Sequence, residues 1–329
     1  MLAGLAASPA FARSKQPRIC SNTAQLQFSA CFAELNDDYL TSKAKCLNVV
    51  DEDARDECFD DAKQERGETF SLCRDQKEAR EAFCEEIGEG AYAPDMSPSL
   101  FQDPRDPATP NPYFPLAVGD FWVFEEEEER IEIRVLDETK RVDGIDCIVV
   151  NDRVFVDEKV VEDTDDWFGI RTDGSIEYCG EAVQDFEIFP GDDPEEEQLV
   201  SIEGSFKAGL DGAKSGTAFL GAPVVGQSYR QEWDAGNAED TGKVLSVAYA
   251  HGQSATLDEF VPEALAMLMC AQADCVVIQD GSTLDPDAFE RKYYARGVGK
   301  FLEVKPEEGI AIPLIECNTD PRCSSLPVD

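Results

Sequence analysis

The spacing of the first six cysteines constrains the fold of this chain more than any other feature. Intervals of 11, 15, 12, 15 and 11 residues, the same in both directions, separate Cys20, Cys31, Cys46, Cys58, Cys73 and Cys84. In an antiparallel helical hairpin the numbers of facing residues have a constant sum, because both helices rise by the same 1.5 Å per residue. The spacing therefore predicts a hairpin with its turn near Glu52 and the disulfides Cys20–Cys84, Cys31–Cys73 and Cys46–Cys58.

The residues between these cysteines favour helices. The segments 25–47 and 54–87 are rich in Ala, Glu, Lys, Gln and Leu and contain no proline, and Asp51 is suited to cap the second helix. Successive disulfides would lie about 16 and 22 Å apart along the hairpin, too far for six thiolates to share one metal ion. A three-helix bundle broken at 36–38 and 66–67 is the competing interpretation. It leaves an unpaired cysteine at each end, so we favour the hairpin.

The chain has 12 cysteines, an even number, and the other six have neighbours suited to pairing. We expect Cys270–Cys275 and Cys317–Cys323 to pair locally, which leaves Cys147–Cys179. Spacing alone does not prove this connectivity. A zinc site that uses Cys270 and Cys275 is the alternative, but no matching second pair of cysteines lies nearby.

The start of the chain and the cysteine content both predict export. Residues 1–12 read as the remnant of a signal peptide, with an apolar stretch at 2–10 and the small-x-small cleavage pattern Ala10-Phe11-Ala12. Abundant paired cysteines are typical of oxidising compartments. No apolar run is long enough to span a membrane. We therefore expect a secreted or periplasmic protein.

Beyond the hairpin, assigned to residues 20–88, the composition changes twice. Residues 89–112 contain six prolines and predict an extended linker. Residues 113–329 contain short β-branched runs such as Phe121–Phe124 and Cys275–Ile278. We expect tight turns at Asp143-Gly144, Asp173-Gly174, Asp211-Gly212 and Asp280-Gly281. The predicted fold is α+β: a disulfide-linked antiparallel helical hairpin followed by an antiparallel β-meander, either a barrel or a half-barrel, lipocalin-like.

Several motifs resemble those of a widespread group of uncharacterised secreted bacterial proteins. They comprise Cys84-Glu85-Glu86-Ile87-Gly88, the run from Asn111 to Phe124 (NPYFPLAVGDFWVF), Val142 to Cys147 (VDGIDC), Tyr229 to Trp233 (YRQEW) and Lys292 to Gly299 (KYYARGVG). The likeness spans most of the chain after Cys20, although we expect Pro in the group where Arg296 stands here and often Tyr where Phe124 stands. The resemblance implies this architecture and export, and it implies no activity.

The charge of the chain excludes two classes of partner. With 69 Asp and Glu against 29 Lys and Arg, the formal net charge is −40. Nucleic acids and anionic membranes would be repelled, so we expect neither as a partner. Cations are expected to gather at the acidic surface. A saline habitat would also explain this acidity, because carboxylates keep a surface hydrated.

The sequence contains no recognised catalytic motif. Its one histidine, His251, has no accompanying nucleophile motif and reads as a solvated turn residue. A carboxylate-dependent hydrolase is the enzymatic alternative, and its candidate residues are Glu232, Glu239 and Asp240, beside Arg230 and Trp233. Salt-bridged strands with an aromatic rim are the simpler interpretation of that segment.

Two kinds of binding site are also expected. Asp163, Asp165 and Asp166 are dense enough in oxygen ligands to hold calcium, the one cofactor that we consider, although they do not match an EF-hand, and a solvated acidic surface explains them equally. A ligand pocket at the mouth of a barrel would be lined by Trp122, Trp167, Arg230, Trp233 and Tyr294. Such aromatic residues more often fill a core.

Taken together, these features predict an exported, non-enzymatic binding or scaffold protein. Its partner would be another protein or a small ligand, and the stiff hairpin would serve as a docking arm. A secreted carboxylate-dependent hydrolase and a calcium-binding extracellular protein are the alternatives. The hydrolase requires a deep cleft that contains two facing carboxylates, at least one of them with a raised pKa.

Overall fold

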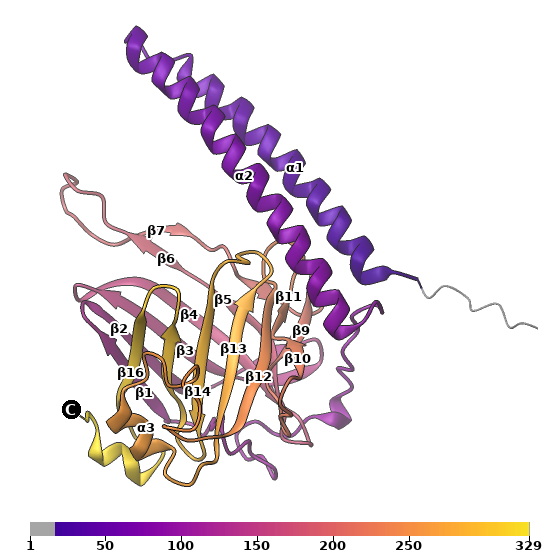
Figure 1. Ribbon diagram of the computed structural model, residues 1–329, viewed down its shortest axis with the longest axis vertical. Coiled ribbons are helices and arrows are strands. Elements are labelled where there is room, and N and C mark those ends of the chain that lie inside the picture. Colours follow the sequence, from indigo (N-terminus) through magenta and orange to yellow (C-terminus); the bar gives the residue numbers. More distant parts are fainter. Residues whose placement is uncertain (1–16, 329) are drawn as a thin grey trace, which may run out of the picture.

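The computed structural model describes residues 17–328, so the predicted signal-peptide remnant lies outside the described residues. Helices α1 (Ile19–Cys46) and α2 (Glu52–Ile87) form the predicted antiparallel hairpin, which projects from the β domain (Figure 1). Asp51 caps α2 by accepting a hydrogen bond from the Ala54 backbone N–H at 2.9 Å. A five-residue turn, residues 47–51, joins the two helices. Both helices run without interruption through 36–38 and 66–67, where the three-helix interpretation placed breaks.

Three disulfides join the two helices at matched heights. They link Cys20 to Cys84, Cys31 to Cys73 and Cys46 to Cys58, with Cα–Cα distances of 5.7, 5.8 and 5.6 Å. Eight residues of the two helices are buried, and four of these are cysteines. Covalent links therefore replace most of the apolar core that a two-helix element is too small to build. The other six cysteines pair as Cys147–Cys179, Cys270–Cys275 and Cys317–Cys323, and no free cysteine remains for a zinc site.

The proline-rich linker packs along the outer face of the barrel (Figure 1). It contains one short 3₁₀ helix, η1 (Pro98–Leu100). Met96 and Phe101 cover a small apolar cluster on the sheet that includes Trp167 and the Cys147–Cys179 disulfide. The linker is thus extended, as expected, and it closes a second, minor core.

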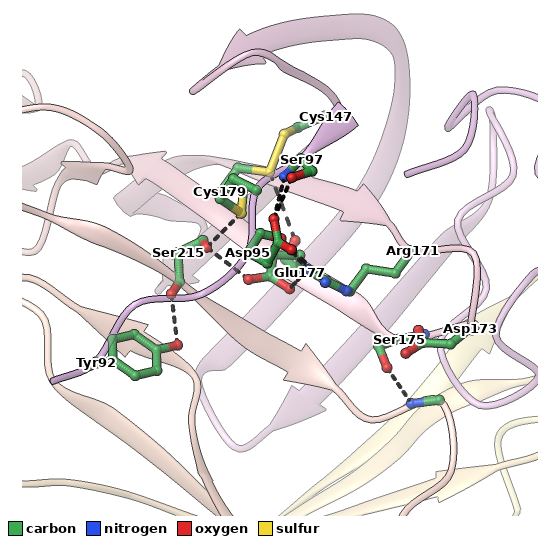
Figure 2. Close-up of polar contacts among 12 residues, drawn as sticks. Tyr92, Asp95, Ser97, Cys147, Arg171, Asp173, Ser175, Glu177, Cys179 and Ser215 are labelled. Carbon is green, nitrogen blue, oxygen red and sulfur yellow. Dashed lines mark hydrogen bonds and ion pairs between the residues drawn. A yellow bond between two sulfur atoms is a disulfide. The ribbon is translucent and has the colours of Figure 1, made fainter. Parts of the chain in front are cut away.

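A polar network on the barrel surface fixes the start of the linker (Figure 2). The Tyr92 hydroxyl donates to the Ser215 carbonyl at 2.8 Å, and the Ser215 hydroxyl donates to Glu177 at 2.7 Å. Arg171 donates to the same Glu177 carboxylate at 2.9 Å and to the Asp95 carbonyl at 3.3 Å. Glu177 is buried, so this network satisfies a carboxylate that would otherwise lack partners.

Residues 121–317 form one long antiparallel sheet that curls into a nearly closed barrel (Figure 1). The strand order is β10-β12-β13-β14-β15-β16-β1-β2-β3-β4-β5-β9-β11, while β6, β7 and β8 pair beside β4 and β5. The strands are β1 (Phe121–Glu126), β2 (Glu129–Val142), β3 (Ile145–Val156), β4 (Lys159–Ile170), β5 (Ile176–Ala182), β6 (Asp185–Glu187), β7 (Gln198–Ser201), β8 (Phe206–Lys207), β9 (Lys214–Phe219), β10 (Ser228–Arg230), β11 (Glu232–Trp233), β12 (Asp240–Tyr249), β13 (Cys275–Ser282), β14 (Phe289–Ala295), β15 (Gly299–Lys305) and β16 (Ile310–Cys317).

One stretch of chain, residues 228–233, joins the two edges of this sheet, and we call it the closing segment. Its first half, β10, pairs with β12, and its second half, β11, pairs with β9. The backbones approach so closely here that a Cβ atom on Gly216 would lie 2.1 Å from the Gln231 carbonyl oxygen. Only glycine fits at that position.

Three of the four predicted turns are confirmed, and one is wrong. Asp143-Gly144 links β2 to β3 with positive φ at both residues, and Asp173-Gly174 and Asp211-Gly212 also lie between strands. Asp280-Gly281 lies within β13 instead. Both residues pair with β12 and with β14, so hydrogen bonding on both sides overrides the local turn preference.

The β domain has one large apolar core. Tyr293, Phe301, Ile148, Ile170 and Leu314 are among the largest fully buried residues. Two short elements that the sequence interpretation did not include lie outside the sheet: α3 (Glu263–Met269) and η2 (Pro321–Ser325). Among residues 17–328, no helix is long and apolar enough to cross a membrane.

Candidate functional site

The barrel encloses a cavity of about 300 Å³ next to its apolar core. Alternate side chains of each strand point into the barrel. Along a strand, these inward-facing residues change from polar to apolar. On β4 they are Glu162, Thr164 and Asp166, followed by Phe168. The cavity therefore has a polar end lined by carboxyl groups and an apolar end lined by aromatic rings.

The apolar end is built from five aromatic side chains. Phe114 packs edge-on against Phe168 with ring centroids 5.3 Å apart, and it lies 6.4 Å from Tyr294. Trp122 is held by a hydrogen bond from its Nε1–H to the Val298 carbonyl at 2.6 Å. Phe124 completes this rigid surface, against which an apolar or aromatic group would pack.

The polar end contains far more carboxyl groups than counterions. Seven carboxyl side chains and two lysines line the cavity: Asp152, Glu162, Asp166, Glu181, Glu232, Asp240, Asp280, Lys292 and Lys300. Lys292 is ion-paired with Asp280 at 2.9 Å, and Lys300 with Glu303 at 3.1 Å. Within residues 17–328, the other six carboxyl groups of the lining have no ion-pair partner.

Burial raises the pKa of several of these carboxyl groups. It raises the pKa of Asp152 to about 7, despite the opposing positive charge of Lys300. Burial likewise raises the pKa of Glu181 to about 7, even though the Tyr178 hydroxyl donates a hydrogen bond to it at 3.0 Å. The Asp152 Oδ1 atom is buried and has no hydrogen-bond partner among the described residues. These groups therefore exchange protons near neutral pH.

The pKa values of Asp166 and Glu232 are raised as well. Burial, together with the neighbouring charges of Glu181 and Asp152, raises the pKa of Asp166 well above its ordinary value. Burial and the charge of Asp240 do the same to the pKa of Glu232. The Tyr178 hydroxyl lies within hydrogen-bond distance of both Asp166 and Glu181, and these two carboxyl groups share its single proton. The cluster thus holds protons that an incoming positive charge would displace.

The residues predicted to line one ligand pocket are divided among three places. Trp122 and Tyr294 line the barrel cavity. Arg230 and Trp233 line a second cavity, outside the barrel wall at the base of the hairpin. Trp167 belongs to the minor core beneath the linker. The prediction of a single pocket from these five residues is wrong, because they lie on five different strands and some side chains point into the barrel while others point away from it.

The residues named for a hydrolase are divided in the same way. Glu232 and Asp240 line the barrel cavity, whereas Glu239 lies in the second cavity, where Arg80 donates two hydrogen bonds to it at 2.7 and 3.1 Å. The three candidates therefore do not form one site. His251 lies in the turn after β12 and lines neither cavity.

The predicted calcium ligands are also separated. Asp163 and Asp165 both accept hydrogen bonds from the Asn151 side chain, and Asp163 is ion-paired with Arg153 at 2.7 Å. Asp166 faces the barrel cavity instead. Strand alternation causes this separation, so a shared site for the three is wrong. The structure, as far as residues 17–328 show, contains no group of three or more His, Cys, Asp or Glu side chains that could hold a metal ion.

Sequence reasoning missed much of the carboxyl cluster. Asp152, Glu162, Glu181 and Lys292 were not singled out, although each occupies an inward position of a β-rich segment. The sequence pattern that could have indicated them is a charged residue at an alternate position of an apolar strand, such as Asp152 two positions after Val150. Its meaning depends on knowing which face of the strand points inward.

Comparisons with known proteins add no functional information. No protein-family model, no curated protein and no solved structure matches this chain. Functional inference therefore depends on the geometry of the cavities.

Proposed function

We propose that this protein is an exported binding protein whose barrel cavity takes up a small organic cation with an aromatic or aliphatic body. One observation carries the proposal: six carboxyl groups without counterions line the cavity directly beside an aromatic surface. An ammonium group placed among them would supply the missing positive charge and hydrogen-bond donors. The apolar body would pack against Trp122 and Phe168, and aromatic rings also attract cations.

Three further features support a cationic ligand. Both lysines of the lining already have carboxylate partners, so the cavity has no free positive group for an anion. Asp152 Oδ1 is a buried acceptor without a donor in the described part of the chain. The excess negative charge of the whole chain would speed the arrival of a cation by long-range attraction. Six disulfides are typical of proteins that fold in an oxidising compartment, which supports export.

Calorimetric titration with 2-naphthylmethylammonium, at fixed ionic strength of about 0.15 M, tests this function. We expect one saturable site, and affinity that rises between pH 6 and pH 8, because the ligand binds best to deprotonated Asp152 and Glu181. Binding should release protons, so the measured heat should depend on the ionisation enthalpy of the buffer.

Two substitutions locate the site. Glu232→Gln should weaken binding of this probe about tenfold, because it removes a carboxyl group that could lose its proton and pair with the cation. Asp146→Asn is the matched control, since Asp146 is an exposed carboxylate paired with Arg141 on the outside of the barrel. Equal binding by both variants would show that the cation binds the acidic surface, and the proposal would be abandoned.

A carboxylate-dependent hydrolase is the second candidate, because Asp152 and Glu181 in this cavity have the raised pKa values that a general acid requires. Binding is favoured over catalysis for one reason. The seven carboxyl groups come from six different strands around the cavity, whereas a glycosidase uses a single facing pair. Release of p-nitrophenol from nitrophenyl glycosides and esters by the wild type, lost in Asp152→Asn, would reverse this preference.

Two expectations from the sequence stay predictions. Calcium-linked stability predicts that a chelator lowers the melting temperature at constant ionic strength. A docking role for the hairpin fits its projection from the barrel (Figure 1), and it predicts a partner that binds the full chain.

A further inference from the structure

A second cavity, of about 530 Å³, lies where the base of the hairpin meets the barrel. Three parts of the chain form it: the helix ends joined by the Cys20–Cys84 disulfide, the first residues of the linker, and the outer face of the closing segment. The closing segment separates the two cavities, and the alternation of its side chains is interrupted at Gln231, between β10 and β11. Arg230 and Trp233 face this one, whereas Gln231 and Glu232 face the barrel interior.

The charge of this lining is opposite to that of the barrel cavity. Arg80, Lys214 and Arg230 line it, and Glu239 is the only carboxylate of the lining within residues 17–328. Glu239 is not free to neutralise another cation. It accepts two hydrogen bonds in a buried ion pair with Arg80 and a third from the Gly236 backbone N–H at 2.7 Å. A cationic cavity is unexpected in a chain of net charge −40.

Arg230 has the environment of a cation that lacks its anion. Its guanidinium lies between two rings, 5.1 Å from the centroid of Phe83 and 5.4 Å from that of Tyr92. In the described part of the chain it has no ion-pair partner, and its buried Nε–H has no acceptor. Burial lowers the pKa of Arg230, so the environment destabilises its charge.

The other two cations of the lining also have donor groups without an acceptor among the described residues, although Arg80 is ion-paired with Glu239. Arg80 is almost fully buried, and its Nη1 group has no acceptor within residues 17–328, although Nε and Nη2 donate hydrogen bonds to Glu239. Lys214 forms no ion pair among the same residues. A desolvated guanidinium normally has a carboxylate or phosphate partner, because burying an unpaired charge costs several kcal/mol. Arg230 and Lys214 supply donors for such a partner, whereas the carboxylate of Glu239 is already paired with Arg80.

We propose that this cavity binds a small aromatic carboxylate, whose carboxylate group contacts Arg230 and Lys214 and whose ring packs among Tyr92, Trp233 and Phe83. The planar fork of arginine matches a carboxylate in geometry, and the aromatic lining fits a ring better than it fits a hydrated inorganic anion. The site is independent of the barrel cavity, because the closing segment lies between them.

Calorimetry with three probes of one shape tests this site. They are 2-naphthoate, the neutral 2-naphthalenemethanol and the cationic 2-naphthylmethylammonium, all at about 0.15 M ionic strength. We expect 2-naphthoate to bind one site at least tenfold more tightly than the neutral alcohol, because only the carboxylate accepts charge-assisted hydrogen bonds. Equal affinities of the anionic and neutral probes would overturn the proposal.

Substitutions assign the binding to this cavity. Arg230→Gln should weaken 2-naphthoate binding at least tenfold. Arg141→Gln, on an exposed arginine that pairs with Asp146, is the matched control and should bind as the wild type does. Because Arg230 also packs against the hairpin, Lys214→Gln provides a second test that leaves this packing intact, with an expected loss of about threefold.

The outcomes separate this site from the barrel site. Loss of 2-naphthoate binding in Arg230→Gln and Lys214→Gln, with 2-naphthylmethylammonium binding unchanged, would support the second site. If Glu232→Gln loses binding of 2-naphthylmethylammonium but binds 2-naphthoate as the wild type does, the two sites are independent, as proposed. Wild-type affinity for 2-naphthoate in both Arg230→Gln and Lys214→Gln would refute it.

Discussion

The buried ion pair between Arg80 of α2 and Glu239, just before β12, is expected to hold the hairpin against the barrel. The side chains are only 8% and 4% exposed, and Arg80 donates to both carboxylate oxygens. Burial raises the pKa of Glu239, but the hydrogen bonds and charge of Arg80 more than offset this, so the pKa is lowered overall. Glu239 is therefore ionised in the folded protein at neutral pH.

Removing one partner should cost about 3–5 kcal/mol, because it leaves the other charge buried and unpaired. Glu239→Gln nearly preserves the side-chain volume, so the loss would be electrostatic rather than a packing defect. The same two regions provide a control in the pair between Glu86 and Lys243, whose side chains are 44% and 40% exposed at 2.8 Å. Glu86→Gln should cost no more than about 1 kcal/mol.

Urea unfolding and hydrogen exchange would measure the two effects. All three tryptophans lie in the barrel, so their fluorescence follows the barrel, while circular dichroism at 222 nm follows mainly the hairpin. Faster exchange in residues 76–90 would show that the hairpin has separated from the barrel. The double variant Arg80→Met with Glu239→Met should be less destabilised than Glu239→Gln, because no unpaired charge remains.

Two results would refute this reasoning. One is a cost for Glu239→Gln no larger than that for Glu86→Gln. The other is a double variant less stable than Glu239→Gln, which would mean that lost packing determines the cost and not the unpaired charge.

Three further predictions concern stability. Replacing Cys31 and Cys73 together by alanine should cost about 2–4 kcal/mol and lower the 222-nm unfolding midpoint without moving the tryptophan transition; coincident shifts would contradict this. Because the folded pKa of Asp152 is raised to about 7, the folded state binds the extra proton and stability falls as pH rises from about 4 to 7. Asp152→Asn should therefore stabilise the protein by about 2–4 kcal/mol at pH 8 and by almost nothing at pH 4, and equal effects at both pH values would be inconsistent with the buried charge. Gly216→Ala should prevent barrel closure, seen as loss of the folded tryptophan spectrum, whereas Gly67→Ala, which meets no neighbour, should stabilise α2 by up to about 1 kcal/mol.

The sequence by itself determined the hairpin and its disulfides. Helix rise is the same in every α-helix, so the palindromic cysteine spacing fixes which cysteines face each other. Asp51 as a cap and Asp143-Gly144 as a turn are equally local, because each depends on a few backbone atoms and one side chain. Export is predicted from residues 1–12, which lie outside the described structure.

Only the tertiary structure decided which polar residues meet. Asp280-Gly281 has the local signature of a turn, yet two neighbouring strands hold it extended and direct Asp280 into the barrel. Arg230 and Glu232 are two positions apart, yet they line different cavities, because the closing segment passes from one edge of the sheet to the other between them. Sequence spacing records neither long-range pairing nor which face of a strand is buried, and these two properties determine both candidate sites.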